Sequence, residues 1–201
     1  ALGLHLGVRA ADPDAMGRAA DRVRAQAVTA RAPTLVKDVQ GLLPLSPAKN
    51  KRLAIYSGGV VVPFAPHPLP LDLPDMLARE GFEVTMLQDG AQPDPAKFDA
   101  MLYLFAEETL LTRGRIFLDW AKVAGGFQGA MQRHWHDIPT AIISFGYPYY
   151  LYDAPRVATY INAYATMPSM QAAVLDCLLG RAPWAGTPPH DPFCGLGDAR
   201  Y

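Results

Sequence analysis

Two adjacent carboxylates, Glu107 and Glu108, follow a short run that ends at Phe105. The run Phe98 to Phe105 is mostly apolar and aromatic and predicts a strand, so both glutamates lie at its carboxyl end. Ligands of open α/β sheets collect outside such strand ends, where a carboxylate can supply a proton or accept hydrogen bonds from a sugar. The alternative is that both side chains are solvated in a surface loop, because successive side chains point apart.

An aromatic turn provides the second candidate surface. Tyr147, Tyr149 and Tyr150 follow Gly146, and Pro148 fixes its own φ and holds Tyr147 in an extended conformation. Tyrosine combines an apolar ring with a polar hydroxyl, so these side chains are candidates to face a carbohydrate or a neighbouring domain. They could equally pack at the edge of the core.

Two other polar motifs, a histidine pair and a glycine-containing stretch, do not have the pattern of a metal or cofactor site. His134 and His136 are two residues apart, which places them on opposite sides of a helix, and no third metal ligand has a suitable spacing. The Ser-Gly-Gly stretch at 57–59 lacks the G-x-G-x-x-G pattern and precedes a proline-rich stretch instead of a helix. We therefore expect neither a metal site nor a bound cofactor.

Length and charge narrow the class of protein. The 201 residues suit one domain, and 18 basic against 19 acidic residues, without a run of like charge, disfavour nucleic acid and anionic membranes as partners. The stretch from Leu53 to Leu71 is uncharged, but its four prolines would break a membrane-spanning helix. Cys177 and Cys194 are too few for a disulfide framework.

The best-defined elements lie in the C-terminal half. Thr140 to Phe145 is typical of a strand buried on both faces, and Val157 to Tyr164 alternates as a second strand. A helix begins at Pro168 and ends at Gly180, which we expect to adopt a left-handed cap conformation. Residues 181–201 are rich in proline and glycine, which predicts a tail packed across the domain surface.

The N-terminal half alternates in the same way. Asp12 and Pro13 predict the start of a helix that runs to about Ala32, with one packed apolar stripe and one solvated face. Further elements follow along the chain: strands at 34–37, 52–56 and 82–87, a turn at 57–59, and helices at 72–80 and, in part, 114–137. This alternation predicts an α/β fold, a three-layer α/β/α sandwich with a mainly parallel sheet and flavodoxin- or Rossmann-like layering.

The order of several short motifs resembles the C-terminal domain of family 3 glycoside hydrolases, in particular their two-domain β-N-acetylglucosaminidase branch. Residues 145–149, Phe-Gly-Tyr-Pro-Tyr, are similar to the family's Gly-x-Pro-Tyr strand end. The strand and helix that follow match at Ala163-Tyr164, Ser169, Ala172-Ala173 and Leu178-Leu179-Gly180. Upstream, residues 34–38 and 42–45 are similar to the family's entry into this domain, and residues 1–4 resemble the end of its preceding barrel.

One family segment is matched incompletely, and the family's catalytic signature is not found in this chain. Pro183, Gly186 and Pro188 approximate the next family segment, but its Leu-Pro-Val ending is missing. The branch's nucleophilic aspartate, Asp-His acid/base pair and Lys-His-x-Pro-Gly signature belong to the barrel, and no segment here matches them. We therefore assign no catalytic residue to this chain and expect it to be inactive alone.

The resemblance implies a parent enzyme of carbohydrate metabolism that cleaves β-linked N-acetylhexosamine or a related glycoside by a retaining mechanism. Residues 1–33 would be a linker and helix leading from the barrel, and residues 34–201 the sandwich domain. This accessory domain would brace its partner, the N-terminal barrel, and meet carbohydrate through the parent. The alternative is a free-standing α/β module that binds a sugar or a nucleotide without chemistry.

Overall fold

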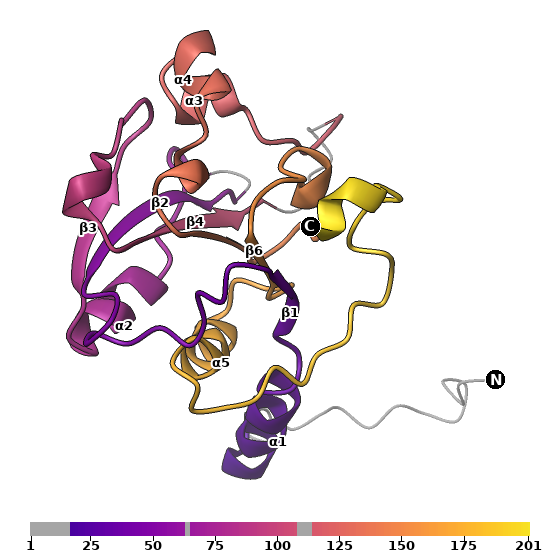
Figure 1. The fold of residues 1–201 in the computed structure, drawn as a ribbon. Coiled ribbons are helices and arrows are strands. Elements are labelled where there is room, and N and C mark those ends of the chain that lie inside the picture. The colour runs from indigo at the N-terminus through magenta and orange to yellow at the C-terminus, as the bar shows by residue number, and fades with distance from the viewer. Residues whose placement is uncertain (1–16, 63–64, 108–113) are drawn as a thin grey trace.

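The computed structural model describes residues 17–62, 65–107 and 114–201, and these contain one six-stranded sheet (Figure 1). Its order is β1-β6-β5-β4-β2-β3; every pairing is parallel except that of β1 with β6. The strands are β1 Thr34–Asp38, β2 Arg52–Val60, β3 Glu83–Leu87, β4 Ala100–Ala106, β5 Thr140–Ser144 and β6 Thr159–Asn162. All six strands predicted from the sequence are therefore present, and the mainly parallel sheet is confirmed.

Helices cover both faces of this sheet, which gives the three layers. Helices α2 (Leu73–Arg79) and α5 (Pro168–Leu178) lie below the sheet as drawn in Figure 1, and α3 (Trp120–Val123) and α4 (Phe127–Met131) lie above it. Because successive strand residues point to opposite faces, Leu102 packs in the core with α2 and α5, and its neighbour Tyr103 in the core with α3. Every residue of β4, β5 and β6 is buried, which explains their uncharged sequences.

Helix α5 ends as its sequence predicts. Gly180, two residues past the helix, has φ +71°, the left-handed conformation expected of a helix cap. A β-carbon built at Gly180 would lie 3.1 Å from the Cβ of Pro44, so this glycine also allows the 42–45 segment to approach. The amide of Leu45 donates to the carbonyl of Leu178 at 2.8 Å and ties that segment to the helix.

The first helix differs from its prediction. Asp12 and Pro13 lie outside the described residues; Arg18 has an extended backbone, and α1 spans Ala19–Thr29. No residue of α1 is buried, and Val23 on the expected packed stripe is 64% exposed. The predicted packing of this stripe is wrong within this chain, because α1 lies beside α5 without its apolar side chains entering the core.

Two further details correct the expected elements. The stretch 57–59 is not a turn, because β2 continues through it to Val60 with an irregular register against β4. Residues 114–137 form less helix than expected, only α3, α4 and a 3₁₀ turn at His134–His136. No described helix is long and apolar enough to cross a membrane.

Candidate functional site

The connections of the parallel strands create a switch point at the carboxyl edge of the sheet. After β2 the chain goes to β3 on one side, and then returns to β4 on the other side of β2. Numbered from β2, the parallel strands have the order 2-1-3-4-5, which is the flavodoxin-like order. Ligands of such folds bind where the two directions of winding diverge, so the ends of β2, β3 and β4 are the first place to search.

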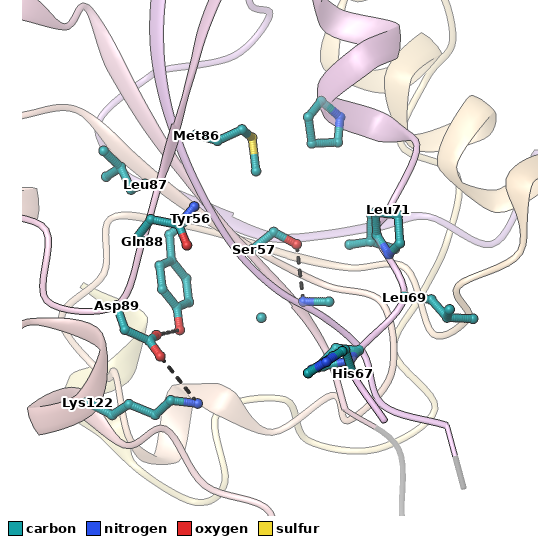
Figure 2. Close-up of a pocket in the computed structure, with 15 residues that line it drawn as sticks. Tyr56, Ser57, His67, Leu69, Leu71, Met86, Leu87, Gln88, Asp89 and Lys122 are labelled. Atoms are coloured by element: carbon teal, nitrogen blue, oxygen red, sulfur yellow. Dashed lines mark hydrogen bonds and ion pairs between the residues drawn. The ribbon is translucent and has the colours of Figure 1, made fainter. Parts of the chain in front are cut away.

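A cleft of about 560 Å³ lies at the ends of β2 and β3 (Figure 2). We call it the β2–β3 cleft; its polar lining includes Tyr56, Ser57, His67, Gln88, Asp89 and Lys122. The Tyr56 hydroxyl donates to Asp89 Oδ1 at 2.7 Å, and Lys122 Nζ lies 3.6 Å from Asp89 Oδ2. Figure 2 shows these three side chains as a chain of contacts on one side of the cleft, with His67 and Leu69 on the other side.

Tyr56 acts here as a fixed hydrogen-bond donor. Its side chain is almost fully buried, and burial, followed by the hydrogen bond to Asp89, raises its pKa well above the ordinary value. The phenol therefore stays protonated across the physiological range and holds the Asp89 carboxylate on this side of the cleft.

One wall of the cleft depends on the end of β2. Val60 and Leu69 form an antiparallel bridge, with their amides and carbonyls paired at 2.7 and 2.9 Å. Gly59 has φ +69°, and a β-carbon built there would lie 2.7 Å from the Cβ of Pro68. Only glycine fits this position without displacement, and its fit brings residues 67–69 against the strand.

The opposite wall joins the end of β3 to α3. The amide of Gly90 donates to the carbonyl of Val123 at 3.0 Å, and Gln92 Nε2 donates to the carbonyl of Ala124 at 2.6 Å. These two bonds fix the segment after Asp89 against the helix that carries Lys122. The ion pair between Asp89 and Lys122 on this side of the cleft is therefore a consequence of how the loop after β3 packs on α3.

A smaller cavity of about 150 Å³ lies between the ends of β2 and β4. Glu107 lines it with Phe117, Asp119 and Lys122, so the first of the two predicted glutamates does reach the switch point. Glu108 lies outside the described residues. The backbone carbonyl of Glu107 accepts from the amide of Tyr147 at 2.9 Å, so the structure places these two candidates side by side.

The three candidate tyrosines have different surroundings. Tyr147 is partly buried and meets the rings of Tyr149 and Tyr150 edge-on, with centroids 5.4 and 5.3 Å apart. Tyr150 is fully buried, against Phe105 at 5.1 Å, so the expectation that its ring faces outward is wrong. The 3₁₀ turn at Tyr150–Tyr152 turns its side chain into the core, where its amide donates to the Tyr160 hydroxyl at 3.2 Å.

The C-terminal tail covers the edge beside Tyr149. Pro188 to Pro192 pack against Pro148, Tyr149, Asn162 and Tyr164 and leave only about 10 Å³ of free space. Lys37 Nζ, on β1, holds the end of the tail through the carbonyls of Ala199 at 2.5 Å and Tyr201 at 3.4 Å. The predicted packing of residues 181–201 across the surface agrees with these contacts.

The histidine pair has no metal-site geometry. Within the described residues, no group of three His, Cys, Asp or Glu side chains is arranged to hold a metal ion. Burial lowers the pKa of His134, which favours its neutral form beside Trp135.

Sequence analysis missed the residues of the β2–β3 cleft. Ser57, Asp89 and Lys122 are single polar residues in three separate segments, and none has a distinctive motif. The available signal was positional: Gln88 and Asp89 directly follow the predicted strand at 82–87, at the same edge as Glu107.

Comparison with known proteins extends this picture. No family model matches the chain. It is 33% identical, over 213 aligned residues, to a β-N-acetylglucosaminidase/β-glucosidase of Cellulomonas fimi; the alignment covers 98% of this chain and 37% of that protein. It superposes on β-glucoside phosphorylase BglX with a TM-score of 0.79 and 30% identity, covering 92% of this chain and 34% of that one.

A glycoside hydrolase family 3 β-N-acetylglucosaminidase from a Paenibacillus species shares the fold, with a TM-score of 0.59 at 18% identity over 90% of this chain and 34% of that protein. The chain is thus similar in sequence to one part of the first two relatives, and its fold is that of a domain of a family 3 glycoside hydrolase. It spans little more than a third of the length of these relatives and therefore corresponds to one domain of such a glycosidase.

Proposed function

We propose that this family 3 domain is the C-terminal, accessory domain of an enzyme that resembles the β-N-acetylhexosaminidases, and that it braces a catalytic barrel. The observation that carries the proposal is the alignment: almost all of this chain matches little more than a third of a β-N-acetylglucosaminidase/β-glucosidase. The remaining length of that relative is enough for a separate catalytic domain. In this proposal the carboxyl edge of the sheet, with Glu107 and Tyr147, contributes to the rim of the active site.

An exposed aromatic cluster next to that edge supports the proposed contact with the barrel. We call it the Arg115 patch: the Arg115 guanidinium lies over the rings of Phe117 and Tyr152, at 5.6 and 5.9 Å from their centroids. Both rings are at least half exposed, and an ion pair with Asp153 at 3.7 Å holds Arg115 in place. Tyrosine and arginine are, with tryptophan, enriched among the residues that dominate the energy of protein interfaces.

The test uses the portion of the Cellulomonas fimi relative that lies outside the match. This portion is purified and mixed with our chain, and association is measured by sedimentation velocity. We expect a one-to-one complex, weakened about tenfold or more by the double change Phe117→Ala and Tyr152→Ala. Phe127→Ala, which removes another exposed ring outside the patch, should leave the affinity unchanged.

A second assay addresses the chemistry. Because retaining glycosidases need two suitably placed carboxyl groups and we assign none to this chain, it should hydrolyse aryl β-N-acetylglucosaminides no faster than a buffer blank. Turnover that is lost in Glu107→Gln would place the chemistry in this domain and contradict the accessory role.

The β2–β3 cleft favours a second candidate, a free-standing sugar-binding module. The nucleotide form of this alternative has less support, because residues 57–59 lie within β2 and do not open a helix that could bind phosphate. Absence of a complex with the barrel portion, together with sugar binding by the chain alone, would favour the module.

A further inference from the structure

We infer that the β2–β3 cleft is a saccharide-binding subsite carried by this domain itself. The inference goes beyond the accessory role, because it concerns a site built wholly from described residues of this chain. It also differs from the tyrosine turn, which lies at the ends of β5 and β6.

Position and size both suit a small ligand. The cleft lies beside the switch point of a parallel sheet, where ligands of this fold class bind. Its volume of about 560 Å³ falls within the range of about 300 to 1,000 Å³ that is usual for ligand sites.

The polar groups of the cleft retain bonding capacity toward hydroxyl groups. Asp89 accepts one bond at Oδ1 and faces Lys122 at Oδ2, which leaves lone pairs on both oxygens of an exposed carboxylate. Lys122 Nζ has three N–H donors and contacts Asp89 through this same ion pair, so it can also donate to a ligand. Ser57 Oγ accepts from the amide of Gly59 at 3.3 Å, so its own hydrogen is available to donate. An acceptor beside a donor is what two neighbouring hydroxyls of a pyranose ring require.

The cleft also has apolar lining. Pro68 and Leu69 contribute to it, with Leu69 beside His67 on the side opposite Asp89, and Met86 contributes from near the end of β3 (Figure 2). Leu69 and Met86 are about half exposed, so their apolar surfaces are accessible from the cleft. A sugar has one polar edge and C–H faces, so it would contact both kinds of lining at once.

Charge argues against a phosphate or a nucleotide in the same place. Lys122 is already neutralised by Asp89, and His67 is the other basic residue of the described lining. The described lining of the cleft therefore holds no lysine or arginine that lacks an acidic partner. Neutral hydroxyl-rich ligands fit this balance and anions do not.

The experiment titrates the 201-residue chain with N-acetylglucosamine, glucose, N,N′-diacetylchitobiose and cellobiose, and detects binding by saturation-transfer NMR. We expect at least one of these sugars to bind with millimolar affinity. Asp89→Asn keeps an acceptor for Tyr56 but removes the charge, and Lys122→Met removes the donor; each should weaken binding about tenfold. Lys122 is exposed, so its variant reports on binding even if Asp89→Asn is less stable.

The chain offers a matched control at the opposite edge of the same two strands. Lys51 and Glu83 form an exposed ion pair of 3.0 Å at the amino ends of β2 and β3. Lys51→Met and Glu83→Gln remove equivalent charges from the same strands, and should leave the sugar affinity unchanged.

Several results would overturn the inference: no binding of any of the four sugars, equal binding by the cleft variants and the wild type, or loss of binding in Tyr149→Ala. Competition by inorganic phosphate would identify an anion site instead. If Asp89→Asn weakens association with the barrel portion and no sugar binds, the cleft receives a barrel segment. The accessory role would survive that outcome, and sugar binding would survive a failure of the association test.

Discussion

The carboxyl edge of the sheet has two halves whose polar side chains have different partners. At the ends of β5 and β6, Ser144 donates to the carbonyl of Tyr147, Asn162 donates to that of Pro148, and Tyr160 accepts from the amide of Tyr150. At the ends of β2 and β3, Asp89 accepts from the Tyr56 hydroxyl and pairs with Lys122 of α3. The first half is closed by its own chain, and the second is an open cleft.

This difference shows what decides where a ligand can bind. The strand ends of both halves carry polar groups, but those of the closed half bond the backbone of residues 147–150, which the tail then covers. In the open half a carboxylate and an ammonium group remain about half exposed. Whether a polar side chain can bind a ligand therefore depends on whether its hydrogen-bonding groups are already used within the chain. The presence of tyrosines decides less.

The largest effect is expected in the closed half. Tyr150→Ala empties a fully buried aromatic position, which should lower the free energy of unfolding by about 3 to 5 kcal/mol in urea titrations. Tyr152→Ala, two residues later and 58% exposed, should change it by less than about 0.5 kcal/mol. Equal losses in both variants would mean that the two tyrosines do not differ in packing as described.

The next effect concerns the wall of the open half. Gly59→Ala forces an alanine into a left-handed conformation and against Pro68, and should cost about 2 to 4 kcal/mol in the same titration. Gly58→Ala is a matched control, because a β-carbon at Gly58 meets no atom within 4 Å. A cost at Gly58 as large as at Gly59 would contradict the close approach of residues 68 and 69.

The sequence predicted the centre of the sheet well because β4, β5 and β6 are fully buried, and their uncharged composition is typical of buried strands. β4 and β5 are apolar runs without charge, and Gly180 follows the last apolar turn of α5. The direction of each tyrosine could not be predicted in the same way. Tyr149 and Tyr150 are adjacent and chemically identical, and only the 3₁₀ turn decides that the second enters the core.

The cleft was unpredictable for a different reason. Asp89 and Lys122 are 33 residues apart, and each alone resembles an ordinary solvated charge. Their proximity depends on two hydrogen bonds from Gly90 and Gln92 to the end of α3, which no local pattern encodes. The prediction for α1 failed for the opposite reason. Its apolar residues do repeat at helical spacing, but no surface of the described chain covers them.

A smaller effect is expected at Gly180. Its φ is positive like that of Gly59, but a β-carbon there would meet only a side chain, whereas one at Gly59 would also meet backbone atoms. Gly180→Ala adds strain at φ +71° and meets only the side chain of Pro44, so it should cost about 1 kcal/mol. Gly197→Ala, with open space around it, should cost less. Thermal melting at fixed pH checks both, and an unchanged melting temperature for Gly180→Ala would contradict the cap.

The smallest effect tests how the closed half is held, through the pH dependence of stability. Burial, and then the charge of Arg156, lower the pKa of Lys37 from 10.5 to about 8, while Asp198 opposes the shift. Between these two pH values the unfolded chain binds more protons at this lysine than the folded chain does. The free energy of unfolding should therefore rise with pH through that window, because the penalty for burying the charged form is present below pH 8 and disappears above 10.5.

Lys37→Met removes this titration and keeps every other group, so the difference between wild type and variant isolates it. Urea titrations at several pH values should show the wild type gaining stability relative to the variant between pH 8 and 10.5. The variant also loses the bonds to Ala199 and Tyr201, so a thiol reagent should modify Cys194, a partly buried residue of the tail, faster. Sugar binding in the open cleft should not change. Parallel stability curves would contradict the lowered pKa of Lys37, and an altered sugar affinity would show that the two halves of the edge are not independent.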